Sequence, residues 1–286
     1  MATFSPSLER LLARDHAAIS DKGRTAAYLH GQRRPRAVLL LHGLTSSPPQ
    51  FERYARELHA RGHNVLVPRL PRHGYADRLS TVLEKLRPDE LYAAGGHYVE
   101  IARELGDRVT VAGFSLGGLL AAWIAHTYEV DRAVAIAPFF GVAWVPGFLM
   151  SSVAELALRV PNQFAWWNPF VRDRQYPQHG YPRYATHAVA HMYRMSKTIM
   201  RESLHRAPLT QRVVLVTNAR EAAVNNRAIY RLYQRWRRHH PELIELLVLE
   251  GMPLSHDVVE PLRHTELAER AFPFLLNAID PLSEKP

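Results

Sequence analysis

One serine stands between glycines at a point where the sequence changes character. Ser115 lies in Gly113-Phe114-Ser115-Leu116-Gly117, which fits the pattern Gly-x-Ser-x-Gly. An apolar run precedes this motif and helix-forming residues follow it, so the serine is expected at a sharp strand-to-helix turn. Such a turn crowds the residues two before and two after the serine, where only glycine fits. The motif therefore predicts a nucleophilic hydroxyl at Ser115, with Gly113 and Gly117 shaping the turn.

A serine nucleophile needs a base, and the base needs a carboxylate that holds its tautomer. His256 follows the predicted strand 243–250, so its loop is expected at the same edge of the sheet as Ser115. Glu221 is the only acid in the loop TNAREAAVNN, which follows the predicted strand 211–217. The chain order serine, acid, histidine accompanies this kind of turn. We therefore expect a catalytic triad of Ser115, Glu221 and His256.

Two backbone N–H groups are expected to hold the oxyanion of such a reaction. One belongs to Leu116, at the start of the helix that follows the serine. The other comes from VLLLHGLTSSP, residues 38–48, where Gly43 allows close approach and the N–H of Leu44 is the candidate. His42 ends a buried strand, and we expect it to be a structural hydrogen-bonding residue rather than a base.

Three further residues are alternative site residues. Asp257 is a rival acid because it adjoins His256, although an adjacent side chain is expected to point away from the imidazole. His187 and His191 are four residues apart and could share a helix face, as metal ligands do. No glutamate follows His187 in the H-E-x-x-H manner, and the chain has no cysteine and no phosphate-binding or dinucleotide motif. We expect neither a metal site nor a cofactor.

The segments around these residues alternate between apolar runs and amphipathic ones. Strands are expected at 36–42, 64–68, 108–113, 131–138, 211–217 and 243–250. Helices are expected at 47–62, 87–106, 116–128, 227–240 and near 261–278. This alternation is typical of an α/β fold with a mostly parallel central sheet and helices on both of its faces.

The alternation stops after Pro138. Residues 139–208 are rich in aromatic residues and prolines and contain no evident strand. We expect one core, residues 1–138 and 209–286, interrupted by an inserted and mainly helical cap or lid at 139–208. The alternative is a helical extension that only packs against the core. Within the insertion, Trp166-Trp167 could line an acyl pocket or pack the cap.

The composition of the chain limits the classes of partner and the cellular location that we expect. The formal charge is +9, but the basic residues are spread along the chain. The densest basic run, 227–240, is expected to be a helix that packs on the core with one face and exposes its basic face to solvent. We expect no nucleic-acid partner and at most a weak association with a membrane surface. The chain has no secretory-signal pattern at its start, no run of 18 apolar residues and no cysteine. We therefore expect a cytoplasmic protein without a transmembrane segment.

Four motifs together carry a resemblance to a known family. HGLTSSP, the RLPRHG of 69–74, GFSLGG and SHD resemble the α/β-hydrolase fold, and within it the bacterial carboxylesterase and monoacylglycerol-lipase branch, which is similar to serine aminopeptidase-like proteins. The resemblance runs through most of residues 36–280. It implies that 139–208 is the family's cap, and it places Glu221 where family members usually carry aspartate.

These observations predict a serine hydrolase that cleaves a small apolar carboxylic ester through an acyl-enzyme intermediate. An aminopeptidase-like amide hydrolase on the same triad is the alternative; it would need an acid in the cap to bind an α-amine, and Glu155 and Asp173 are the acids within 139–200. A non-catalytic binding protein on this fold is a third interpretation. The natural substrate, its acyl length, the oligomeric state and the physiological role are left open by the sequence.

Overall fold

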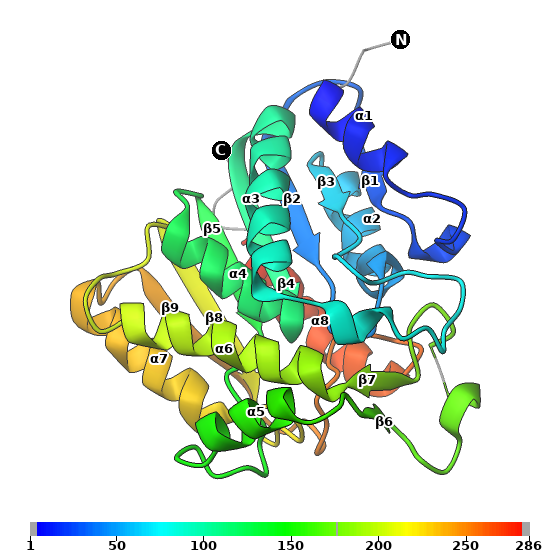
Figure 1. Ribbon diagram of the computed structural model, residues 1–286. Helices are drawn as coiled ribbons and strands as arrows, with labels where there is room; N and C mark the ends of the chain where they lie inside the picture. The colour runs from blue at the N-terminus through cyan, green and yellow to red at the C-terminus, as the bar shows by residue number, and fades with distance from the viewer. Residues whose placement is uncertain (1–4, 176, 282–286) are drawn as a thin grey trace.

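The computed structural model describes residues 5–175 and 177–281. In that part of the chain seven strands form one sheet, in the order β1-β3-β2-β4-β5-β8-β9 (Figure 1). β1 runs antiparallel to β3, and the other neighbouring pairs are parallel. The strand bounds are β1 (Ala26–Tyr28), β2 (Arg34–Leu41), β3 (Asn64–Val67), β4 (Gly106–Phe114), β5 (Arg132–Ile136), β8 (Arg212–Asn218) and β9 (Ile244–Leu249). The predicted α/β fold with a mostly parallel sheet is confirmed.

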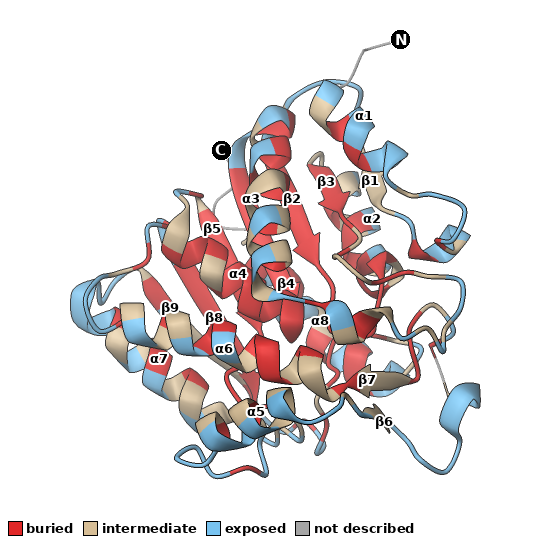
Figure 2. Ribbon diagram, in the orientation of Figure 1, coloured by how far each residue is buried: buried red, intermediate tan, exposed pale blue. Residues whose placement is uncertain are grey.

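The apolar runs of the sequence become strands because the sheet is covered on both faces. Residues 37–41 of β2 and 64–67 of β3 are at most 1% exposed, and Figure 2 shows the central strands buried along most of their length. Each of the six predicted strands is present. The edge strand β1 was not predicted, because three residues are too few to show an alternation of apolar and polar side chains.

Helices lie on both faces of the sheet: in Figure 1, α3 and α4 are in front of it and α8 is behind it. The helix bounds are α1 (Pro6–Ala13), α2 (Glu52–Ala60), α3 (Pro88–Leu105), α4 (Leu116–Thr127), α5 (Met150–Arg159), α6 (Thr186–Glu202), α7 (Asn226–His239) and α8 (Thr265–Ile279). α2 follows a short 3₁₀ turn, Pro48–Phe51, so the helix predicted at 47–62 is present in two pieces.

The inserted segment, residues 139–208, lies below the carboxyl ends of the strands in Figure 1. It contains α5 and α6, as predicted, and a two-stranded antiparallel ribbon of β6 (Phe164–Trp166) and β7 (Arg183–Ala185). The expectation that 139–208 holds no strand was therefore wrong. Each strand has only three residues, and the two are far apart in sequence, so neither a periodic pattern nor a hairpin turn signals them.

The parallel sheet brings distant loops together at one edge. The loops after β2, β4, β8 and β9 all leave the sheet at its carboxyl edge, because parallel strands share one direction. These loops carry Leu44, Ser115, Glu221 and His256, respectively. Chain segments more than 200 residues apart can therefore contribute to one site at this edge.

Candidate active site

Ser115 occupies a strained turn between β4 and α4. Its φ is 55° and its ψ is −107°, a region that residues other than glycine rarely adopt. The main chain holds it there: the Ser115 N–H donates to the Ile136 carbonyl at 2.9 Å, and the Ser115 carbonyl accepts the Leu119 N–H at 2.8 Å. The hydroxyl is thereby presented at the end of the strand rather than packed along it.

The glycines of this turn are needed because the backbone crosses itself at close range. A Cβ on Gly113 would lie 2.1 Å from the Gly117 carbonyl oxygen, and a Cβ on Gly117 would lie 1.9 Å from the Leu41 carbonyl oxygen. Both distances are far below van der Waals contact. The geometry is the crowded turn that the Gly-x-Ser-x-Gly pattern predicts.

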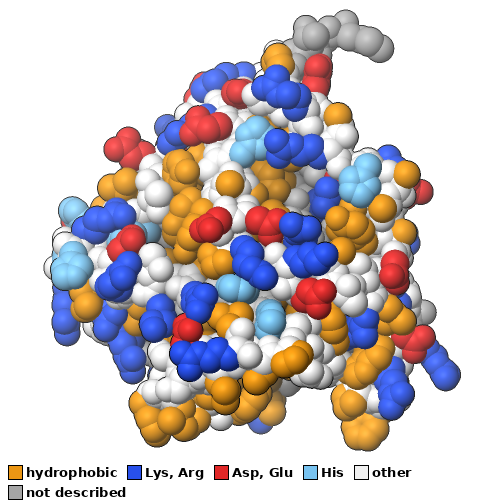
Figure 3. Space-filling view, in the orientation of Figure 1, with side chains coloured by type: hydrophobic (Ala, Val, Ile, Leu, Met, Phe, Trp, Pro, Cys, Tyr) orange, Lys and Arg blue, Asp and Glu red, His pale blue; other side chains and the backbone are white. Residues whose placement is uncertain are grey.

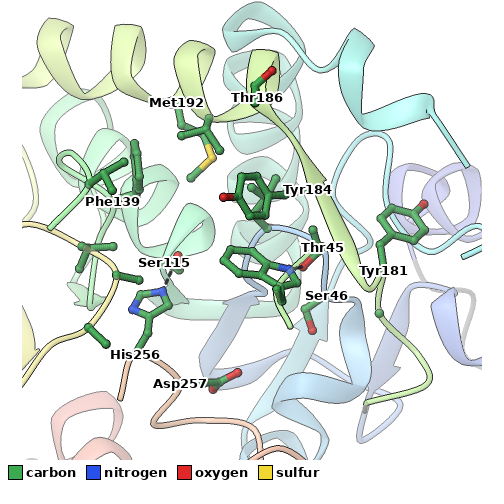
Figure 4. Close-up of a pocket in the computed structure, with 18 of the residues that line it drawn as sticks. Thr45, Ser46, Ser115, Phe139, Tyr181, Tyr184, Thr186, Met192, His256 and Asp257 are labelled. Carbon is green, nitrogen blue, oxygen red and sulfur yellow. Dashed lines mark hydrogen bonds between the residues drawn. The ribbon is translucent and has the colours of Figure 1, made fainter. Parts of the chain in front are cut away.

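The structure brings Ser115, His256 and Glu221 into one hydrogen-bonded chain, of which Figure 4 shows the Ser115–His256 pair. The His256 Nε2 lies 2.9 Å from the Ser115 Oγ, and the His256 Nδ1 lies 2.8 Å from the Glu221 Oε1. The Glu221 side chain is 1% exposed, whereas that of His256 is 18% exposed. A carboxylate oxygen can only accept, so the Nδ1 of a neutral His256 carries the proton and its Nε2 accepts from the serine.

The loop around Glu221 fixes its carboxylate. Its Oε1 also accepts the N–H groups of Ala223, at 2.8 Å, and Val224, at 3.3 Å, while Oε2 is buried without a hydrogen-bond partner among the described residues. Only one oxygen is therefore organised, and that oxygen faces His256. The two N–H groups hold it in place.

Asn218 and Gln50 support the site, and sequence reasoning missed both. The buried Asn218 Nδ2 donates to the Pro253 carbonyl at 3.0 Å and to the Ser255 carbonyl at 2.9 Å, which ties the end of β8 to the loop of His256. The Gln50 Oε1 accepts the Gly43 N–H at 2.8 Å. A single amide side chain at the end of a strand or in a short 3₁₀ turn gives no sequence signal, because such residues are common near turns.

Asp257, the rival acid, makes no contact with the imidazole of His256. Its Oδ1 accepts the N–H groups of Val259 at 3.1 Å and Glu260 at 2.9 Å, so it closes the turn that follows His256. Figure 4 shows its carboxylate away from the Ser115–His256 pair. Burial raises the pKa of this carboxyl, and the two N–H groups oppose the rise.

His42 orients the loop on the other side of Ser115. It is fully buried; its Nε2 accepts the Leu70 N–H at 3.0 Å, so its Nδ1 carries the proton and donates to the Gly43 carbonyl at 3.0 Å. Burial holds the pKa of His42 well below its ordinary value, so the ring is neutral and structural, as expected. The Gly43 carbonyl and the Leu44 N–H belong to one trans peptide, so anchoring the carbonyl directs the N–H to the opposite side.

Leu44 and Leu116 flank Ser115 from two elements. Leu44 lines the cavity that also contains Ser115 and His256, and Leu116 is the first residue of α4. The free N–H groups of a helix start are directed away from the helix, toward its N-terminal end. The two candidate oxyanion donors therefore come from the β2 loop and the α4 terminus.

A cavity of about 370 Å³ opens above the serine. At one end it is apolar and is formed largely by the inserted segment, with Phe139, Met150, Val153, Ala154, Val189 and Met192 among its lining residues. The other end carries polar side chains, including Thr45, Ser46, Arg78, Gln175 and Arg263. In Figure 4, Phe139 and Met192 lie on one side of Ser115, and Thr45 and Ser46 on the other.

The adjacent tryptophans of the insertion, Trp166 and Trp167, differ in their surroundings. Trp167 lines the cavity, and its Nε1 donates to the Thr45 Oγ1 at 2.8 Å, beside the Leu44 loop. Trp166 is paired with Arg183 across β6 and β7, and the Arg183 guanidinium lies over its ring at 5.8 Å. Of this adjacent pair, only Trp167 lines the cavity above Ser115.

The two histidines considered as metal ligands have no third ligand beside them in the part of the chain that the structure describes. His187 places its Nε2 3.0 Å from the Val160 carbonyl, and burial lowers the pKa of His191 to about 4. Within residues 5–175 and 177–281, no group of three or more histidine, cysteine, aspartate or glutamate side chains could hold a metal ion. In the same ranges, every helix is too short or too polar to cross a bilayer.

The chain is similar to proteins of known family and structure. The sequence model of the alpha/beta hydrolase family matches residues 38–270. Among solved structures it resembles one from a study of the metagenome-derived lipolytic enzymes LipS and LipT, with a TM-score of 0.67, 18% identity and coverage of 90% of this chain and 98% of the other. The monoacylglycerol lipase of Paleococcus ferrophilus gives a TM-score of 0.65 at 17% identity, covering 89% of this chain and 98% of that one.

A soluble variant of the monoglyceride lipase of Saccharomyces cerevisiae is similar as well. The TM-score is 0.65 at 12% identity, with 86% of this chain and 87% of the other covered. At these identities the likeness concerns the fold. The sequence has no match among curated proteins.

Proposed function

The chain belongs to the alpha/beta hydrolase family, and on that premise we propose that it is a serine hydrolase that cleaves carboxylic esters through an acyl-enzyme intermediate. One observation carries the proposal. Ser115 and His256, the first two members of the hydrogen-bonded chain that ends at Glu221, line a cavity whose far end is apolar. A nucleophile, its base and the group that orients the base are thus placed where an acyl chain fits.

In the proposed reaction, the Ser115 Oγ attacks the ester carbonyl while His256 Nε2 takes the hydroxyl proton. The Leu44 and Leu116 N–H groups hold the oxyanion of the tetrahedral intermediate. As the intermediate collapses, His256 gives its proton to the departing alcohol and the acyl group stays on Ser115. Water then attacks the acyl-enzyme with His256 again as base, which releases the acid and restores the serine. Throughout, Glu221 holds the imidazole and stabilises its protonated form.

We assign residues 139–208 as a cap on a core formed by 1–138 and 209–286. α5 and α6 supply much of the apolar end of the cavity, including Met150, Val153 and Met192. This wall suits a small apolar acyl group, since an aliphatic chain gains about 0.8 kcal/mol per buried CH₂. The charge of an acidic acyl group would find no partner there.

The positions and partners of the acidic side chains favour ester cleavage over an aminopeptidase-like reaction. Glu155 is paired with Arg194 at 2.7 Å on the surface, and neither Glu155 nor Asp173 lines the cavity. Asp257 is the one acid among the described lining residues, and its Oδ1 is occupied by two backbone N–H groups. An α-amine would therefore find no free carboxylate in the described part of the cavity.

The surface of the cap fits a weak association with a lipid surface. Trp144, Phe148 and Phe170 are 77%, 83% and 94% exposed, and in Figure 3 apolar side chains gather along the lower edge of the molecule, where α5 lies. Phe148→Ser should reduce co-sedimentation with lipid vesicles, and unchanged sedimentation would refute the association. The cytoplasmic location stays a prediction from the sequence.

A substrate panel tests the reaction class. We expect turnover of 4-nitrophenyl esters with a preference for uncharged acyl chains, and no turnover of aminoacyl-anilides. Hydrolysis of the anilides with inert esters would favour the aminopeptidase-like alternative. Inertness toward both classes would favour a non-catalytic binding protein.

A further inference from the structure

Charge is distributed unevenly in the cavity. Of the residues that line it, Arg78 and Arg263 are cationic and Asp257 is the one acid in the described part of the chain. Contacts place both arginines near Thr45. Arg263 lies by Trp167, which donates to the Thr45 hydroxyl, and Arg78 donates to the Gly180 carbonyl, next to Tyr181, whose N–H donates to the Thr45 carbonyl. An ester bound to Ser115 with its acyl chain against the apolar wall would direct its alcohol toward these arginines.

The hydrogen-bond donors of Arg78 are already used within the protein. Its guanidinium donates to the carbonyls of Gly180 (2.8 Å), Asp173 (2.9 Å), Gln175 (2.9 Å) and Pro177 (3.4 Å) and to the Gln178 side chain. These acceptors use its donor groups, and the bonds hold residues 173–175 and 177–180 beside the cavity. The acceptors are neutral, and among the described residues no carboxylate forms an ion pair with Arg78. Burial lowers the pKa of Arg78, and the charge of the nearby Asp173 opposes that shift.

Arg263 is placed differently. Its guanidinium carbon lies 6.0 Å from the centroid of the Trp167 ring, and its side chain makes no hydrogen bond or ion pair with any residue that the structure describes. Trp167 is itself held by Thr45, beside the Leu44 loop. The Trp167 ring thus lies between this guanidinium and the Thr45 hydroxyl, and the guanidinium donors stay available to a molecule in the cavity.

Asp257 does not neutralise this guanidinium by contact. Its Oδ1 takes the Val259 and Glu260 N–H groups, and its Oδ2 faces the Gln50 amide at 3.4 Å. Asp257 is near enough for the charge of Arg263 to lower the pKa of its carboxyl, but burial has the larger effect and raises that pKa. The cavity lining therefore carries two guanidinium groups, and Arg263 is the one whose donors are not used by described residues.

We propose that Arg263 binds an anionic group, a carboxylate or a phosphate, carried by the alcohol part of the ester. The inference rests on the proposed ester hydrolysis and names the substrate class of that site: an apolar acyl chain joined to an anionic alcohol. A guanidinium with free donors matches either anion in a two-pronged geometry. Arg263 is a specificity-determining residue in this assignment, and Arg78, whose donors are already used, does not touch the anion.

Two matched substrate pairs test the assignment. The first pair is 4-nitrophenyl octanoate and 5-octanoyloxy-2-nitrobenzoate, which differ by a carboxylate on the leaving group. The second is 1-octanoylglycerol and its 3-phosphate. The intact enzyme should prefer the anionic member of at least one pair in kcat/KM, and the pair that shows the preference identifies the anion.

Arg263→Gln should lower the ratio of kcat/KM for the anionic and neutral members by about tenfold, which corresponds to about 1.4 kcal/mol. Arg263→Lys, which keeps the charge but not the planar fork, should retain part of the ratio. Arg270→Gln is the matched control: its guanidinium donates to the Gly251 carbonyl at 2.8 Å outside the cavity, and its ratio should stay unchanged. Added salt should reduce the ratio of the intact enzyme.

The results separate this inference from the proposed function. If the enzyme hydrolyses the neutral esters but neither pair shows a preference, or if Arg263→Gln lowers both members of a pair equally, the anion assignment is overturned and ester hydrolysis stands. If neither neutral nor anionic esters are hydrolysed, the proposed function itself fails.

Discussion

Replacing Glu221 with glutamine removes the charge beside His256 and leaves the shape of the side chain. The outcome depends on which amide atom faces the imidazole. The position of Oε1 receives three N–H donors, from His256, Ala223 and Val224, at 2.8, 2.8 and 3.3 Å. An amide NH₂ placed there would oppose the two backbone donors, so the amide oxygen should take that position. The neutral His256 should then keep its tautomer.

The size of the effect follows from this orientation. When the triad carboxylate is replaced and the histidine takes the wrong tautomer, turnover falls by a factor of about 10⁴. If the tautomer is kept, turnover falls only because the attraction between the carboxylate and the imidazolium formed during the reaction is removed. Two unit charges about 4 Å apart at an effective dielectric constant of about 20 attract by about 4 kcal/mol, which corresponds to about 10³ in rate. The NH₂ would occupy the buried, unpartnered site of Oε2 and should cost about 1–3 kcal/mol of stability.

The assay is kcat on a 4-nitrophenyl ester at fixed pH, together with a thermal unfolding curve. We expect Glu221→Gln to lose about 10³ in kcat and a few degrees in Tm. Asp257→Asn is the comparison, because its Oδ1 can still accept the Val259 and Glu260 N–H groups; it should stay within about tenfold of the unmodified enzyme. If Glu221→Gln loses less than tenfold while Asp257→Asn is inactive, the acid is assigned to the wrong residue.

Two further predictions concern the turn and the pH dependence of stability. Gly117→Ala should abolish ester turnover and lower Tm, since its Cβ would lie 1.9 Å from the Leu41 carbonyl oxygen. The control Gly147→Ala should change neither, because a Cβ there meets nothing within 4 Å. Normal turnover in a folded Gly117→Ala protein would refute the steric explanation. Burial lowers the pKa of His73 and of His126 to about 4, so the folded state binds fewer protons than the unfolded state, in which histidine titrates near 6.5. The free energy of unfolding should therefore be fully retained above about pH 6.5 and fall toward pH 4, which urea unfolding at a series of pH values measures. His73→Gln should make the free energy of unfolding depend less steeply on pH. If its pH dependence equals that of the surface variant His205→Gln, the explanation is contradicted.

The central strands and the chain order of the site were predictable because they depend on local patterns. Apolar runs buried on both faces give the parallel strands, and the Gly-x-Ser-x-Gly motif marks the turn at Ser115. Parallel pairing then places the loops after β8 and β9 at the edge where Ser115 lies. Glu221 could be selected by elimination, because its loop contains no other acid.

The features that sequence reasoning missed depend on contacts between distant segments. β6 and β7 form only because residues 164–166 and 183–185 meet across the insertion. The role of Asn218 depends on two carbonyls of the His256 loop, and that of Gln50 on the Gly43 N–H. Trp166 ends β6 and Trp167 follows it directly, but of the two only Trp167 lines the cavity, where its Nε1 donates to the Thr45 hydroxyl.

The most direct test of the account is active-site labelling with a fluorophosphonate, followed by peptide mass spectrometry. We expect one probe per chain, attached to Ser115, and no labelling of Ser115→Ala or of the protein after unfolding. Ser115→Ala should also lose on the order of 10⁶ in ester turnover and unfold at nearly the same temperature, because the turn is shaped by its glycines. Labelling at another residue, or near-normal turnover in a clean Ser115→Ala preparation, would contradict the proposed mechanism.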